Sequence, residues 1–108
     1  MRETIARYRD LLVARMGVLE EEIRLASARY REREGDFHYV TLENVAVIER
    51  QLRDVQRVRD EFRSMDIARF QSIEDFKETV LARLQELYDS RAILRSGVRM
   101  LIECVRDL

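Results

Sequence analysis

The side chains best suited to chemistry in this sequence are a lone histidine, a lone cysteine and a row of arginines. His38 follows Glu34 at helical spacing, as a pair of metal ligands would. A di-iron helical bundle needs two Glu-x-x-His elements and further carboxylates, and the chain has no second histidine. The sequence therefore predicts no metal site. We interpret His38 as a loop residue between Phe37 and Tyr39.

Cys104 has no histidine near it in sequence and lies on an apolar edge, so we interpret it as a small buried hydrophobic residue. A single cysteine cannot form an internal disulfide, which fits a reducing compartment. The chain also lacks a glycine-rich phosphate loop, a G-x-S-x-G motif and zinc-ligand spacing. We therefore predict no catalytic residues and no cofactor, and a protein that is not an enzyme.

Three arginines form a stripe with a spacing of four residues: Arg91, Arg95 and Arg99. Like charges at this spacing are mildly destabilising, so we expect groups elsewhere to compensate them. Contact with phosphate or nucleic acid is one option. We favour pairing with the acidic cluster in the first third of the chain, within a subunit or across an interface. The predicted partners are Glu20, Glu21 and Glu22 on one side, and Arg91 and Arg95 on the other.

The composition is that of a single helical domain over residues 1–108. The chain has no proline and three glycines, and 38% of its residues are charged. Twenty basic and twenty-one acidic side chains are interleaved and give a formal net charge of −1. No long basic block favours binding to nucleic acid or anionic lipid. The N-terminal residues show no apolar signal core, and no apolar run approaches about 18 residues. We expect a cytoplasmic protein.

The first third of the chain predicts one long helix, about residues 2–34, ended by Gly35. A central apolar row has a seven-residue spacing, and a second row lies on each side of it. A stripe this broad is typical of a bundle. The central row is Ile5, Leu12, Leu19 and Ala26, and the side rows are Leu11, Val18 and Leu25, and Met16, Ile23 and Tyr30.

A second helix is predicted over about residues 42–64. Thr41 is its expected N-cap, and Val40 and Val45 have the spacing of a hydrophobic staple. Ser72 and Asp75 resemble a capping box, so we predict a turn before residue 73. Because the heptad register continues without glycine or proline through residues 64–72, one continuous helix over 42–107 remains the alternative.

The third predicted helix covers about residues 73–107 and repeats an apolar residue every seven positions, at Ile73, Val80, Leu87, Leu94, Leu101 and Leu108. A row of small residues lies beside it, which favours close approach of another helix. The two rows together predict an interface formed by Leu87, Ser90, Leu94, Gly97, Leu101 and Cys104.

These elements predict an all-α fold, an antiparallel bundle or coiled coil of long helices. The short middle helix cannot cover the other two along their whole length, so apolar surface should remain for a partner. We therefore predict a non-enzymatic helical interaction or assembly protein: an adaptor, an assembly factor or a chaperone-like subunit. It should form a homo-oligomer, with a dimer favoured, or pack on a partner's helices. The alternatives are a small helical enzyme with a pocket between helices, and a weak nucleic-acid binder.

Overall fold

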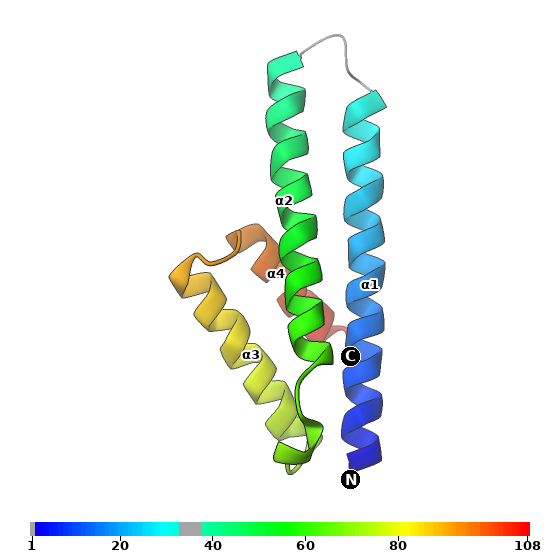
Figure 1. Cartoon of the computed structure of the whole chain (residues 1–108), viewed down its shortest axis with the longest axis vertical. Coiled ribbons are helices and arrows are strands. Elements are labelled where there is room, and N and C mark those ends of the chain that lie inside the picture. The colour runs from blue at the N-terminus through cyan, green and yellow to red at the C-terminus, as the bar shows by residue number, and fades with distance from the viewer. Residues whose placement is uncertain (1, 33–37) are drawn as a thin grey trace.

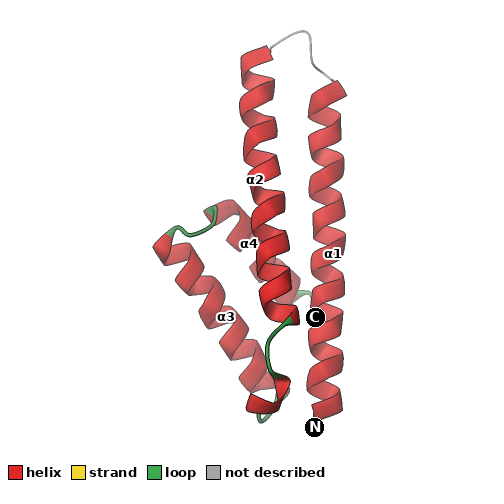
Figure 2. Ribbon diagram, in the orientation of Figure 1, coloured by secondary structure: helices red, strands yellow, loops and turns green. Residues whose placement is uncertain are grey.

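The computed structural model describes residues 2–32 and 38–108, and within them it contains only helices and the turns that join them (Figure 2). The all-α class is confirmed. Four α-helices and one 3₁₀ turn follow in the order α1 (Arg2–Glu32), α2 (His38–Arg63), η1 (Ile67–Arg69), α3 (Ile73–Ser90) and α4 (Arg95–Arg106).

The two long helices, α1 and α2, form an antiparallel hairpin, and the two shorter helices pack against one half of it (Figure 1). α3 and α4 lie beside the half that contains the start of α1 and the end of α2. The other half of the hairpin extends past them as a two-helix arm. The molecule is correspondingly elongated, with principal extents of 55 × 25 × 20 Å.

The hydrophobic core lies where the four helices meet. The central row predicted for the first helix supplies Ile5, Leu12 and Leu19 to this core, which confirms that part of the prediction. Phe62 of α2 and Phe76 of α3 are fully buried. The ring of Phe76 meets two other aromatic rings edge-on, that of Tyr8 at a centroid distance of 5.9 Å and that of Phe70 at 5.0 Å. This arrangement suits the aromatic quadrupole.

The start of α3 follows the predicted capping pattern. The hydroxyl of Ser72 accepts a hydrogen bond of 3.1 Å from the backbone N–H of Asp75. The carboxylate of Asp75 accepts one of the same length from the backbone N–H of Gln71. The N–H of Asp75, which the first turn leaves without a helical partner, is therefore satisfied, and the Asp75 carboxylate binds the residue before the N-cap. The predicted turn before residue 73 is confirmed, and the alternative of a continuous helix over 42–107 is wrong.

α2 begins earlier than expected. Its first residue is His38, so His38 is not in a loop, and Thr41 lies inside the helix instead of at its N-cap. The side chains of Thr41 and Val40, and with them the proposed staple, lie outside the described part of the chain. The predicted stop at Gly35 also lies outside it.

The largest departure from the sequence prediction is a break in the expected third helix. α3 ends at Ser90, and Arg91 adopts the left-handed conformation with φ 58° and ψ 27°. A new helix, α4, begins at Arg95. The prediction of one helix over 73–107 is therefore wrong, and the described residues form four α-helices where three were expected.

The break is explained by what α4 buries after it. The turn lets α4 fold back onto α1 and α2, so its apolar face enters the core. A left-handed conformation costs a non-glycine residue about 1–2 kcal/mol, whereas burial of one large aliphatic side chain contributes about 1.5–3 kcal/mol. Burial of several such side chains outweighs the cost of the turn. The core residues gained are Ile93, Val98, Leu101, Cys104 and Val105.

A buried aspartate of α2 fixes the start of α4. No side chain caps α4 from its own N-cap position, Leu94. Instead the carboxylate of Asp54 accepts a hydrogen bond of 3.0 Å from the Leu94 backbone N–H. Gln51, one turn earlier on α2, donates a 2.7 Å hydrogen bond to the hydroxyl of Ser96. The turn between α3 and α4 is thus held against α2 by polar contacts as well as by packing.

We predict that Asp54→Ala destabilises the protein by about 1–2 kcal/mol, because the Leu94 N–H loses its acceptor at a partly buried helix start. Asp54→Asn keeps an acceptor oxygen and should lose less. Urea unfolding of the two variants measures the difference. Equal stability of Asp54→Ala and the native protein would mean that the cap does not hold α4 in place.

Candidate interaction surface

The most conspicuous apolar surface is an outward-facing row on α1. Leu11, Val18 and Leu25 are 49%, 53% and 51% exposed. They are seven residues apart, so they share one face of the helix. This row was predicted to widen the buried stripe, but only the row on the other side, with Met16 and Ile23, is buried. We call Leu11, Val18 and Leu25 the outer row.

Most of the interface residues predicted from the sequence lie inside the chain's own core. Leu87, Leu101 and Cys104 are 4%, 1% and 1% exposed and pack among the four helices. Leu94 is partly buried in the turn before α4, and Ser90 is exposed at the end of α3. The turn separates these residues, so they do not form one continuous helical row. An interface built on them stays a prediction.

The glycine of the small-residue row is buried but has free space beside it. Apart from its chain neighbours and the backbone of its own helix, a Cβ placed on Gly97 meets no heavy atom of the described residues within 4 Å, and the same holds for Gly17 in α1. Within the chain, therefore, no helix approaches Gly97 closely enough to require glycine.

Burial determines the chemistry of Cys104. Desolvation raises the pKa of its thiol, and this effect outweighs the lowering by the nearby positive charge of Arg15. The thiol is therefore a poor nucleophile at neutral pH, because only the thiolate reacts readily. This agrees with the interpretation of Cys104 as a small buried residue.

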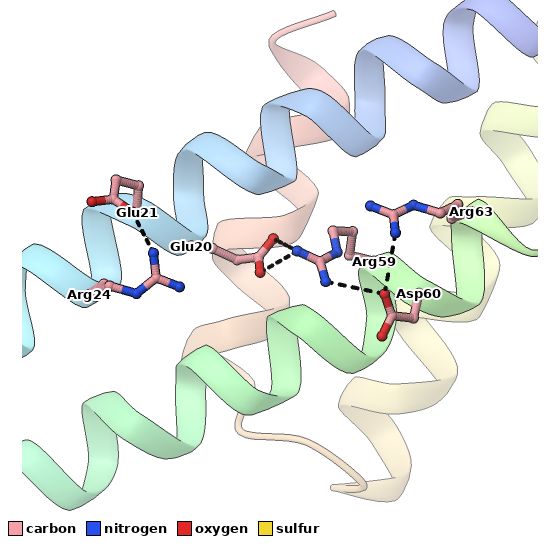
Figure 3. A network of polar contacts seen from close by, with 6 residues as sticks. All are labelled: Glu20, Glu21, Arg24, Arg59, Asp60 and Arg63. Atoms are coloured by element: carbon pink, nitrogen blue, oxygen red, sulfur yellow. Dashed lines mark hydrogen bonds and ion pairs between the residues drawn. The ribbon is translucent and has the colours of Figure 1, made fainter.

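A glutamate of α1 and an arginine of α2 form the main polar contact inside the hairpin (Figure 3). Glu20 is 4% exposed, and the Nη1 group of Arg59 donates to both of its carboxylate oxygens at 2.5 and 2.7 Å. Arg59 also donates to Asp60. Desolvation lowers the pKa of Arg59, but hydrogen bonding to Asp60 and the charge of Glu20 outweigh it and raise the pKa overall. The Arg59 guanidinium is therefore charged.

The other predicted charge-pairing residues are arranged differently. Glu21 pairs with Arg24 on its own helix. The guanidinium of Arg95 lies over the ring of Tyr88 at 4.7 Å from the centroid, and Arg91 is exposed in the turn. Within the chain, Glu20 pairs with Arg59 and not with these arginines. Pairing of Glu21 or Glu22 with Arg91 or Arg95 across an interface stays a prediction.

A shallow concavity beside the α3–α4 turn contains three arginines. Arg50, Arg91 and Arg95 line it together with Ile93 and Leu94. The Nε atom of Arg50 lies 3.9 Å from Oδ2 of Asp54, and the guanidinium of Arg95 lies over the ring of Tyr88. Two of the three guanidinium groups therefore already have partners. These contacts reduce the positive charge that the concavity offers to an anion.

In the described part of the chain, no three histidine, cysteine or acidic side chains are grouped as metal ligands would be. None of the helices described has an apolar stretch long enough to cross a bilayer. Comparison of the chain with protein-family models, with curated proteins and with solved structures found no match.

Gly97→Ala should stabilise the protein by about 0.5–1 kcal/mol, because alanine favours the helix and its methyl group has free space. Gly17→Ala is the matched control in α1 and should have a similar effect. Thermal unfolding at a low protein concentration measures both. A loss of stability with Gly97→Ala alone would show that a close contact at Gly97 does exist.

The Glu20–Arg59 contact can be measured with a double-mutant cycle built from Glu20→Gln and Arg59→Gln. We expect a coupling energy of about 1–3 kcal/mol, since Glu20 is buried and the pair is shielded from solvent. The same cycle on Glu21 and Arg24, both 56% exposed, should give about 0–1 kcal/mol. Equal coupling in the two cycles would contradict the structural role of the buried pair.

Proposed function

We propose that this protein is a non-enzymatic helical interaction or assembly protein that binds helices of other subunits through the outer face of α1. The observation that carries the proposal is the outer row, because three half-exposed apolar side chains in helical register form a stripe of the kind that another helix covers. The occupant is a second copy of the chain or a partner's helix. The roles that fit are those of an adaptor, an assembly factor or a chaperone-like subunit.

The shape of the molecule supports this proposal. Both long helices continue past α3 and α4 as an arm in which each helix is covered only by the other (Figure 1). The outer row runs along the middle of α1, from Leu11 to Leu25. A single stable helix therefore presents the row, which limits the entropy lost on binding.

The two alternative functions have less support. An enzyme pocket between the helices would need unpaired polar groups facing a cavity, whereas the buried carboxylates of Glu20 and Asp54 are bound to Arg59 and to the Leu94 N–H. Nucleic-acid binding would have to use the arginine concavity, in which Arg50 and Arg95 have partners within the chain. Salt-sensitive retention on a nucleic-acid column would favour this alternative.

Replacement of the outer row tests the proposal. Leu11→Gln, Val18→Gln and Leu25→Gln together should keep the fold, since glutamine is a good helix former and the sites are half exposed. We expect this variant to lose self-association in light scattering, and partner capture from source-cell lysate, when either occurs with the native protein. The matched control is Val47→Gln with Leu81→Gln, at exposed apolar positions of α2 and α3. If the triple variant and the control behave alike, the outer row is not the binding surface.

A further inference from the structure

The outer face of α1 has the residue pattern of one strand of a two-helix contact. Leu11, Val18 and Leu25 repeat every seven residues, and the exposed small residues Ala14 and Ala28 lie three residues after Leu11 and Leu25. This is the alternation of three and four residues that packs one helix along another. The corresponding position after Val18 is the exposed Glu21, so one charged residue interrupts the pattern. Small side chains between the larger ones also let a second backbone approach.

Charged residues border this face on both edges. Arg15 and Glu22 follow Leu11 and Val18 by four residues and lie along one edge. Asp10 and Arg24 precede Leu11 and Leu25 by one residue and lie along the other edge. Arg29 follows Leu25 by four residues and continues the first edge, so this edge carries two basic residues and one acidic residue, and the second edge carries one of each. Arg15 and Glu22 lie on opposite sides of the level of Val18, as do Asp10 and Arg24, and Arg29 lies at the level of Tyr8 of an antiparallel copy.

This distribution of charge fits a second copy of the same helix running in the opposite direction. A two-fold axis perpendicular to the helices brings each edge against the same edge of the second copy and reverses the order of its residues. Centred near Val18, it brings Leu11 against Leu25 of the second copy and Val18 against its equivalent. Arg15 then lies opposite Glu22, and Asp10 opposite Arg24. Symmetry forms each of these contacts twice.

The parallel arrangement is less favourable. In that arrangement each edge meets the opposite edge of the second copy. A residue on the second edge then lies closest to the residue five positions later on the first edge of the other chain. Asp10 would meet Arg15, which is attractive, but Arg24 would meet Arg29, which is repulsive. The charges on the outer face therefore discriminate between the two directions.

We propose that the outer row binds a second copy of this chain, with the two α1 helices antiparallel and related by a two-fold axis near Val18. This inference rests on the proposed function and specifies its partner. Val18 lies close to the middle of α1, so the two helices overlap along most of their length. The apolar contact from Leu11 to Leu25 is about 21 Å long at 1.5 Å per residue. An interface this small gives a weak dimer that depends on protein concentration.

The contacts already made by the edge residues are compatible with this dimer. Asp107 accepts hydrogen bonds of 3.3 and 3.2 Å from Arg15 and holds its guanidinium at the edge of the outer face. Asp10 is 71% exposed and Arg24 is 56% exposed at their side chains. Asp10 already pairs with Arg9, and Arg24 with Glu21, just as Arg15 pairs with Asp107, so each pair across the dimer should contribute little.

Cysteine cross-linking tests both the surface and the direction. In a Cys104→Ser background, which removes the native thiol, Val18→Cys should form a disulfide-linked dimer on mild oxidation. Leu11→Cys and Leu25→Cys should link to each other when the two variants are mixed, and neither should link efficiently to itself. The control is Val47→Cys, a site on α2 with 49% exposure, which should remain largely monomeric. Efficient linking of Leu11→Cys to itself, or equal linking at Val18→Cys and Val47→Cys, would overturn the antiparallel dimer.

A charge reversal gives an independent readout in the chain with its native cysteine. Asp10→Arg should weaken the dimer by roughly 2- to 30-fold, because symmetry places two exposed pairs in the interface. Arg24→Asp added to Asp10→Arg should restore part of the affinity, as measured by sedimentation equilibrium. Additive weakening in the double variant would contradict the pairing.

The results separate this inference from the proposed function. If a dimer forms but does not cross-link through Val18→Cys, the inference is wrong. The proposed function still stands in that case if the triple glutamine variant loses association. A native protein that stays monomeric at every concentration also overturns the inference, and partner capture with the triple glutamine variant then decides the proposed function.

Discussion

The shape of this protein depends on how the apolar face of α4 is buried. A two-helix hairpin can cover only one side of each helix, so the rows of α1 and α2 that face away from each other need further cover. α3 and α4 provide it, but only after the chain turns back at Arg91. The carboxylate of Asp54 accepts a hydrogen bond from the Leu94 backbone N–H and fixes the place at which α4 starts. Packing on one half of the hairpin thereby leaves the other half as an arm.

The same division of cover explains the surface proposed for binding. α4 reaches α1 from one side, where Asp107 contacts Arg15, and α2 covers the opposite face of the helix from the outer row. None of the other described helices buries Leu11, Val18 or Leu25. The outer row is thus what remains after the chain has satisfied its own core. Its alternating charges give it a preferred direction for a partner helix.

The sequence predicted the class, the long first helix and the cap at Ser72, because these depend on local periodicity and on hydrogen bonds between near neighbours. It did not predict the break at Arg91. Leu87, Leu94 and Leu101 keep their heptad spacing through it, and no glycine or proline marks the turn, so only tertiary burial explains it. The contact of Glu20 with Arg59 was missed for a similar reason. Arg59 interrupts the apolar seam of α2, a signal that an acidic residue faces it, but the partner depends on how the two helices align.

The outer row illustrates the same limit. Leu11, Val18 and Leu25 look in the sequence like Met16 and Ile23, since both rows are apolar and have a seven-residue spacing. Which row is buried depends on the side from which α2 and α4 approach, and this is not encoded locally. The most direct test follows the methyl resonances of these leucines and valines by NMR during dilution of the native protein. The account predicts that the signals of Leu11, Val18 and Leu25 shift together with concentration, while those of Val47 and Leu81 stay constant. Shifts confined to Val47 and Leu81 would contradict it.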